Sequence, residues 1–195
     1  LHILNHSIFK ELLFLAAGSV YVKTHTTDIE LLGGLIKKMP YSALLFLTGS
    51  IAICGLPPFN GFISEFMIYF GMLKGLSVNN LFMLLVMLLG LSGLALVGTL
   101  AILCFTKAFS IVFLGEARSE KAKNVENDNG CSFILPMSIL ACFSLLIGLF
   151  PKQIFDFITK PASIFINITE LNQITSLMSA ITCVAIALIL TVLVL

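Results

Sequence analysis

Long apolar runs separated by short polar stretches dominate this chain. The runs cover about residues 1–22, 41–74, 81–114, 133–150 and 174–195. A membrane-spanning helix needs about 20 mostly apolar residues, because each residue advances about 1.5 Å through roughly 30 Å of hydrocarbon. Backbone groups in lipid must also find their partners within helices, since no water reaches them. The pattern therefore predicts an all-α, polytopic transmembrane helix bundle.

The second apolar run is too long for one span. As a single helix, residues 41–74 would extend about 50 Å. The sequence GLPPFNG at residues 55–61 interrupts the run, and each proline removes a hydrogen-bond donor and clashes with the preceding turn. We therefore predict that residues 55–61 are non-helical and that one discontinuous helix has halves at about 41–56 and 62–74. The residues assigned to this break are Gly55, Pro57, Pro58, Asn60 and Gly61.

The polar stretches predict loops and their sidedness. Residues 23–40 and 115–131 together carry six Lys and Arg residues, and the alternating loops carry three. Cytoplasmic loops are enriched in these residues, so we expect both stretches to face the cytoplasm. Residues 151–173 mix Pro, Lys and Asp with Phe and Ile, which favours an interfacial linker. Residues 174–195 would then form an additional transmembrane helix.

Composition narrows the class of function. Hydrophobic residues make up 58% of the chain and charged residues 11%, against roughly a quarter charged in a soluble domain. The net charge of +1 offers no basic surface for nucleic acid. The five cysteines stand singly, with no CxxC spacing, so we expect no iron–sulfur cluster, no metal site and no other cofactor. Because the chain starts at Leu1 within an apolar run, we interpret it as a piece of a longer polypeptide.

Three ionizable residues of the first run lie on one helix stripe. His2, His6 and Lys10 are spaced four apart, so each step turns the helix by only about 40° beyond a full rotation. Lys10 precedes Lys23 by thirteen residues, which places it about 20 Å inside the boundary and near the middle of the hydrocarbon. A charge at that depth is costly and usually marks a pathway. Imidazoles change charge near neutral pH, so the stripe predicts a proton relay.

Glu65 is the second candidate site of buried charge. It precedes Lys74 by nine residues, which places it about 13 to 14 Å inside the opposite boundary. It also follows the predicted break, where one half-helix presents free carbonyl groups and the other presents its positive end. We expect an ion or a chain of water molecules to be held there, with Glu65 as part of the same relay.

Structural roles compete with each of these interpretations. His2 and His6 could form hydrogen bonds between helices, or bind a metal as an HxxxH pair, although no third ligand is evident. Lys10 and Glu65 could serve only in ion pairs, but their depth favours a function. Lys107 is a weaker relay candidate, because it lies near the end of its run and suits an interfacial position equally well.

Several strings of the sequence resemble a known family. They are HILNHSIFKELLFLAAGSV, GGLIKKMP, GSIAICGLPPFNGFISEFMIYFG and FTKAFSIVFLGEARS, in this order along the chain. The first three resemble the antiporter-like membrane subunits shared by respiratory complex I, group 4 hydrogenases and Mrp-type sodium/proton antiporters. The sequence GLPPFNGFISEF at the predicted break and the fourth sequence, FTKAFSIVFLGEARS, are most similar to the hydrogenase branch, which includes formate hydrogenlyase. The resemblance covers roughly residues 1–150 and identifies them as the C-terminal part of an antiporter-like membrane domain.

The resemblance assigns roles to the same residues. His2, His6 and Lys10 match the histidine and lysine relay of the family's eleventh helix, and Glu65 matches the ionizable position of its discontinuous twelfth helix. Many distal subunits of complex I have lysine at the position of Glu65. The family's glutamate and lysine on the fifth and seventh helices have no counterpart in this chain.

The function implied is that of a proton-translocating, non-catalytic membrane subunit of an oxidoreductase complex of the hydrogenase or NADH dehydrogenase type. It would have no redox centre and would be multi-pass in a bacterial-type inner membrane. Its partners would be other membrane and peripheral subunits, the lipid bilayer and protons. One alternative is an Mrp-type antiporter subunit that also moves Na⁺. A third hypothesis is an intramembrane metalloenzyme using His2 and His6, which lacks a third ligand and a general base.

Overall fold

Every regular element that the computed structural model describes is a helix. The described residues are 1–77, 80–125, 127, 131–162, 176–178, 180, 181, 183, 184, 187 and 191. The elements are α1 (His2–Thr24), the 3₁₀ turns η1 (Ile29–Leu31) and η2 (Leu35–Lys37), α2 (Pro40–Ile53), α3 (Asn60–Gly75), α4 (Leu81–Phe113), α5 (Glu120–Lys123), α6 (Cys131–Leu149) and α7 (Pro151–Ala162).

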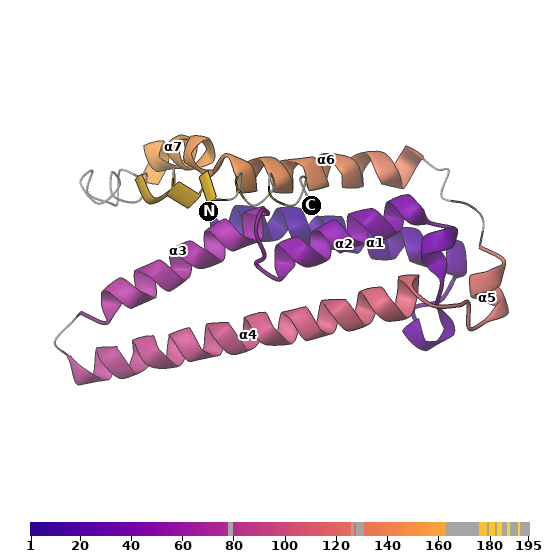
Figure 1. The fold of residues 1–195 in the computed structure, drawn as a ribbon, viewed down its shortest axis with the longest axis horizontal. Helices are drawn as coiled ribbons and strands as arrows, with labels where there is room; N and C mark the ends of the chain where they lie inside the picture. The colour runs from indigo at the N-terminus through magenta and orange to yellow at the C-terminus, as the bar shows by residue number, and fades with distance from the viewer. Residues whose placement is uncertain are drawn as a thin grey trace.

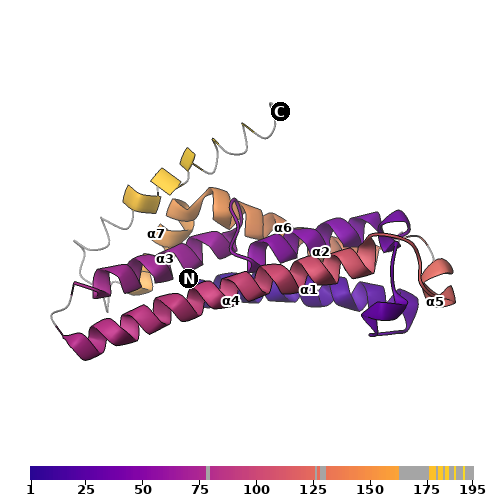
Figure 2. The same ribbon diagram turned by 60° about the horizontal axis from the view of Figure 1, so that its bottom comes forward.

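The long helices lie side by side in three layers. Figure 1 shows α6 along one side, α4 along the other, and α1, α2 and α3 between them. The contacts agree, because α6 packs on α1, α2 and α3, whereas α4 packs on α2 and α3. A second view keeps α2 and α3 roughly in line, one following the other (Figure 2). The short α5 and the turns η1 and η2 gather at one end of this bundle (Figure 1).

Two apolar clusters hold the layers together. The first joins α1, α2 and α6 through Leu12, Ala16, Leu45 and Met137, all of them buried. The second lies at the end where the loops gather, and it joins α1, α2 and α4 to the loops. Its buried members are Val20, Leu32, Leu35, Met39, Ala43, Val112, Phe113, Ala122 and Val125.

Two of the described helices are long and apolar enough to cross a membrane. They are Leu81–Phe113 and Ser132–Leu149. In the most apolar window of the first, no residue is buried within the structure. A core helix of a soluble protein would be covered on most sides, so the uncovered α4 requires lipid or other helices around it. The prediction of an all-α transmembrane bundle is confirmed.

The discontinuous helix is present. α2 ends at Ile53 and α3 begins at Asn60, so Pro57 and Pro58 lie between the two halves, as predicted. The bounds differ from the prediction, because Asn60 and Gly61 already form the first turn of α3. At Gly61 a side chain would overlap the Ala52 carbonyl. Close packing of α3 against the end of α2 therefore extends the helix back through two residues that, by composition, suit a loop.

The segment after α6 begins with a short amphipathic helix. In α7, Phe155 is buried while Lys152 and Asp156 are exposed, which is compatible with a position in the interface plane. The remainder of the predicted interfacial linker, residues 163–173, lies outside the described residues. The predicted additional helix at residues 174–195 is also largely outside them, although residues 176–178 are helical.

Candidate functional site

The first turns of α1 lie beside the start of α3. His2 Nδ1 is 3.0 Å from Ser64 Oγ, so the imidazole and the hydroxyl form a hydrogen bond between the two helices. One turn further along α1, Asn5 Nδ2 donates to the Asn60 carbonyl at 2.9 Å. Asn60 Nδ2 donates in return to the Asn5 carbonyl at 3.3 Å. These bonds connect the histidine end of α1 directly to the helix break.

Helix α6 also contacts the start of α3. Ser144 Oγ donates to Asn60 Oδ1 at 2.6 Å, and the side chains of Asn5, Asn60 and Ser144 are fully buried. At Gly148, one turn later, a Cβ atom would overlap the Pro58 carbonyl, so only glycine permits this approach. Asn60 thus bonds both α1 and α6, and it fixes the position of the break between them.

One buried acceptor in this cluster has no protein partner. Asn5 Oδ1 is fully buried and receives no hydrogen bond from the described residues. A buried polar atom without a partner costs about 1–3 kcal/mol, so such atoms usually bind an ordered water molecule. The hydrogen bond from Asn5 Nδ2 to the Asn60 carbonyl is therefore made at the cost of leaving the oxygen of the same carboxamide without a partner among the described residues.

Glu65 reaches back across the break. It follows Ser64 directly and is half-buried. Its carboxylate lies against Gly55, where a Cβ atom would overlap the Oε2 atom. Gly55 also has φ 63, in the left-handed region that favours glycine. The glycine after α2 therefore creates the space that the Glu65 carboxylate occupies.

The remaining relay candidates follow α1 away from the break. The rings of His2 and His6 are tilted at 47°, with centroids 6.0 Å apart. Lys10 Nζ lies 5.7 Å from the centroid of the Phe14 ring, one turn beyond. His6 is exposed and Lys10 is half-buried. The structure thus brings His2 to Ser64 and His6 close to His2.

The structure does not join Lys10 to Glu65. Among the described residues, the two side chains share no hydrogen bond or ion pair, because Lys10 Nζ lies over the Phe14 ring and the Glu65 carboxylate lies against Gly55. The expectation that Lys10 and Glu65 line one hydrated axis stays a prediction. Lys107 is exposed near the end of α4, which suits the interfacial position considered for it.

The part of the chain that the structure describes offers no ligand set for the metalloenzyme hypothesis. The described residues contain no group of three or more His, Cys, Asp or Glu side chains that could hold a metal ion. His2 Nδ1 is instead engaged with Ser64. A second histidine ring nearby is not enough for a zinc site, which takes at least three protein ligands.

Three polar residues of this cluster were missed by the sequence analysis. Asn5 carries a usable signal, because it is a polar residue three positions from His2 in an apolar run and so shares its face. Ser64 and Ser144 carry little signal, since a serine within a membrane helix usually bonds its own backbone. Only the packing of α6 against α3 reveals the role of Ser144.

Comparison with known proteins adds sequence relatives. Residues 1–94 match the family model described as NADH:quinone oxidoreductase/Mrp antiporter, TM. The chain is 47% identical over 125 residues to formate hydrogenlyase subunit 3 of Escherichia coli (strain K12), a match that covers 63% of the chain and 20% of the relative. It is 38% identical over 169 residues to hydrogenase-4 component B of the same strain, covering 85% of the chain and 25% of the relative.

The chain is also similar to antiporter subunits. The chain is 34% identical over 166 residues to Na(+)/H(+) antiporter subunit A1 of Staphylococcus saprophyticus subsp. saprophyticus, covering 83% of the chain and 20% of the relative. Among solved structures, the Mrp complex from Dietzia sp. DQ12-45-1b matches with a TM-score of 0.57 and 21% identity, covering 77% of this chain and 34% of that one. The match to the Mrp complex shows a shared fold. The chain spans between 20% and 25% of the length of these three curated relatives.

Proposed function

We propose that this chain forms the C-terminal part of the proton path of an antiporter-like membrane subunit, because it is similar in sequence to subunits of hydrogenase and antiporter complexes. The resemblance inferred from the sequence motifs is thereby confirmed. In this proposal the whole protein is a multi-pass subunit of a bacterial inner-membrane redox complex. Other subunits carry the electrons, and this chain carries protons.

The observation that supports the proposal most strongly is the contact between His2 and Ser64. It is 3.0 Å long and links the histidine stripe of α1 to the residue directly before Glu65. The residues Lys10, His6, His2, Ser64 and Glu65 form a series in this order along α1 and the start of α3, with the ring centroids of His6 and His2 6.0 Å apart. Groups that accept and release protons occupy nearly every step of this series.

Each group has a distinct task in the proposed path. The imidazoles of His2 and His6 can accept a proton on one nitrogen and release another from the opposite nitrogen. The Ser64 hydroxyl both donates and accepts, so it can hand a proton on without becoming charged. Glu65 holds the proton beside the break, where the backbone of two half-helix ends and water can stabilise its charged form. Lys10 stores a charge at the far end of α1.

The break gives this path a fixed geometry. Asn60 is bonded to Asn5 on α1 and to Ser144 on α6, so the start of α3 is held while the chain turns through residues 54–59. A proton path requires donors and acceptors within hydrogen-bond reach. The three buried side chains provide a rigid frame for His2, Ser64 and Glu65.

An Mrp-type antiporter subunit is the second candidate. It is favoured by the similarity to subunits named Na(+)/H(+) antiporter subunit A1 and by the fold shared with an Mrp complex. The identity to the two hydrogenase relatives is higher, at 47% and 38%, so we place the hydrogenase type first. Proton flux that depends on a sodium gradient would reverse this order.

The proposal is tested in the full-length protein, assembled with its complex in sealed vesicles. We expect Lys10→Met combined with Glu65→Gln to lower redox-driven proton translocation at least about tenfold, because both changes remove titrating charge while keeping side-chain volume. Proton uptake is followed with a pH-sensitive dye, and assembly is followed by the yield of the intact complex.

Lys107→Met is the matched control. It also removes one lysine charge from an apolar helix, but at an exposed position near the end of α4, so it should leave translocation nearly unchanged. Translocation at the wild-type rate and stoichiometry in the double variant would refute the relay, and the two residues would then be structural.

A further inference from the structure

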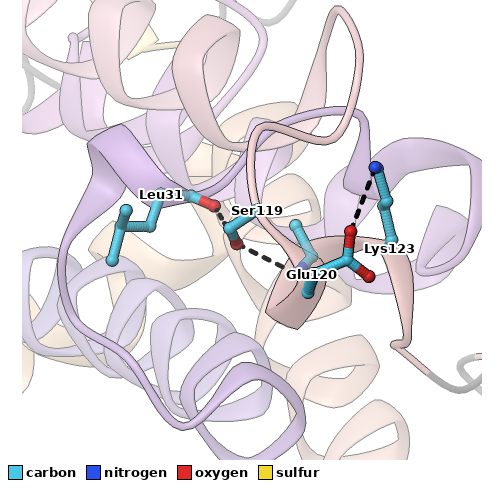
Figure 3. A network of polar contacts seen from close by, with 5 residues as sticks. Leu31, Ser119, Glu120 and Lys123 are labelled. Carbon is cyan, nitrogen blue, oxygen red and sulfur yellow. Dashed lines mark hydrogen bonds and ion pairs between the residues drawn. The ribbon is translucent and has the colours of Figure 1, made fainter.

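Two loops are fastened together at the end of the bundle that carries α5. The first contains η1 and η2, and the second runs from the end of α4 into α5. The amide of Gly34 donates to the Leu114 carbonyl at 2.9 Å, and Ser119 Oγ donates to the Leu31 carbonyl at 2.6 Å. Figure 3 shows Ser119 between Leu31 and the turn of α5, with its oxygen also accepting from that turn.

The contact between the loops is close enough to require glycine. Gly33 and Gly34 have φ angles of 144° and 65°. At Gly33 a Cβ atom would overlap the Glu116 carbonyl, and at Gly34 it would lie 3.0 Å from the Gly115 carbonyl oxygen. The buried apolar side chains of Leu35, Ala122 and Val125 pack beneath them. The two loops therefore form one preorganised unit.

The surface of this unit carries an open pocket in which lysine side chains outnumber acidic ones. The pocket has a volume of about 260 Å³ and is lined by Lys37, Lys38 and Lys123, with Glu116 as its one acidic side chain. Lys123 forms an ion pair with Glu120 at 3.2 Å, and a dashed line marks this pair in Figure 3. Lys37 and Lys38 are exposed and form no ion pair among the described residues. Their two ammonium groups are the ones available to a ligand.

The pocket lies where the membrane surface is expected. Its first loop connects the end of α1 at Thr24 to the start of α2 at Pro40, and its second begins after the end of α4 at Phe113. The ends of three long helices therefore surround it. Lysines at this level are within reach of lipid headgroups, and each contributes about 1 kcal/mol toward an anionic surface.

We propose that this pocket binds an anionic phosphate group, held between the ammonium groups of Lys37 and Lys38. Phosphate oxygens accept strong charge-assisted hydrogen bonds from lysine. The acyl chains of a phospholipid bound in this way can run along the exposed apolar surface of α4. A bound lipid would tie the two loops to the bilayer and keep the ends of α1, α2 and α4 in register. The proposal does not depend on the proton path.

The test compares two double variants of the full-length protein in detergent. Lys37→Gln with Lys38→Gln removes the two free ammonium groups of the pocket. Arg118→Gln with Lys121→Gln removes the same charge from the second loop without changing the pocket lining. Binding of phosphatidylglycerol, phosphatidylcholine and inorganic phosphate is measured by native mass spectrometry and by the shift in Tm.

We expect the wild-type protein to retain phosphatidylglycerol about tenfold more tightly than phosphatidylcholine, whose choline cation competes with the lysines. The Lys37 and Lys38 double variant should lose about tenfold in affinity for phosphatidylglycerol, and the control variant less than about threefold.

Inorganic phosphate separates the two sources of the ligand. Displacement of the lipid by millimolar phosphate would support the site with free phosphate as its ligand, whereas retention supports the lipid. Equal losses in both double variants, or no preference for phosphatidylglycerol in the wild type, would overturn the proposal. Unchanged Tm values of both variants in phosphatidylcholine show that folding is intact.

Discussion

Asn60 connects three helices through a single side chain. Its amide nitrogen binds Asn5 of α1, and its amide oxygen accepts from Ser144 of α6. In a membrane, polar bonds of this kind between helices replace the hydrophobic effect as a source of specificity. The stability of the helix break should therefore depend on neutral polar residues as well as on charged ones.

Serine substitutions test this dependence. Ser144→Ala leaves the buried Asn60 Oδ1 without its donor, so we expect the free energy of unfolding of the full-length protein to fall by about 1 kcal/mol. Ser92→Ala removes an exposed hydroxyl whose one hydrogen bond among the described residues goes to the Leu89 carbonyl of its own helix, and it should cost less than about 0.5 kcal/mol. Denaturant unfolding in detergent measures both. Equal costs would show that the bond to Asn60 adds nothing to stability.

Gly55 offers a second test at the scale of single residues. Gly55→Ala places a Cβ atom on the Glu65 carboxylate at a φ of 63°, so we expect a loss of about 1–3 kcal/mol in stability. Part of this loss should disappear when Glu65→Ala removes the overlapped group, and a double-mutant cycle measures that coupling.

The control for this change is Gly71→Ala. A Cβ atom at Gly71 meets nothing within 4 Å, and alanine favours the interior of α3 by about 0.5–1 kcal/mol. Gly71→Ala should therefore leave stability unchanged or raise it. A cycle without coupling would mean that Glu65 moves freely out of the way of residue 55.

The residues of the site differ in how far the sequence predicts them. Glu65 is recognisable because a carboxylate within an apolar run is costly and therefore rare. Asn5 and Ser144 are not, because neutral polar residues are tolerated within membrane helices at little cost. Their roles arise from contacts between residues 55 and 84 positions apart. No local sequence pattern predicts contacts between residues that far apart in the chain.

At the scale of elements, the break itself follows from local chemistry, but its bounds do not. The missing amide of proline acts within one turn, so Pro57 and Pro58 suffice to predict that the helix stops. The restart at Asn60 depends on bonds to α1 and α6, and the turn before it depends on Gly55. The predicted break of residues 55–61 is consequently wrong at Asn60 and Gly61.

The sidedness of the loops is a prediction that belongs to the same scale. We expect residues 23–40 and 115–131 to face the cytoplasm because they carry most of the loop lysines and arginines. In sealed vesicles of known orientation, a membrane-impermeant thiol reagent should reach Lys121→Cys only from the cytoplasmic side. The same reagent should reach Lys74→Cys, in the last turn of α3, only from the other side of the membrane. The reverse labelling would invert the topology and move the proposed phosphate site to the outer surface.

At the scale of the whole molecule, the uncovered surfaces indicate what is packed around this chain in a complete subunit. The most apolar part of α4 has no buried residue, and such a surface can face lipid. One face of α1 is different, because His6, Ser7 and Glu11 are exposed on it. Polar and charged groups at that depth do not face lipid without a large cost. We infer that additional helices cover this face in the full-length protein, since the segments matched in two relatives make up only 20% and 25% of those proteins.

Glu11 provides the measurement that tests this cover. A carboxyl group that faces lipid is accessible to a hydrophobic carbodiimide, whereas one packed against other helices is protected from the reagent. We expect the isolated chain in a bilayer to be labelled at Glu11 several-fold faster than the full-length protein, as measured by peptide mass spectrometry.

Glu11→Gln identifies the labelled site, because it should abolish the signal from that peptide. Glu120, an exposed residue of α5, should be labelled equally in both preparations and so reports on reagent supply. Equal labelling of Glu11 in both would mean that this face of α1 stays open to lipid in the complete subunit. The proton path would then have to leave α1 at His2 and run through the helix break alone.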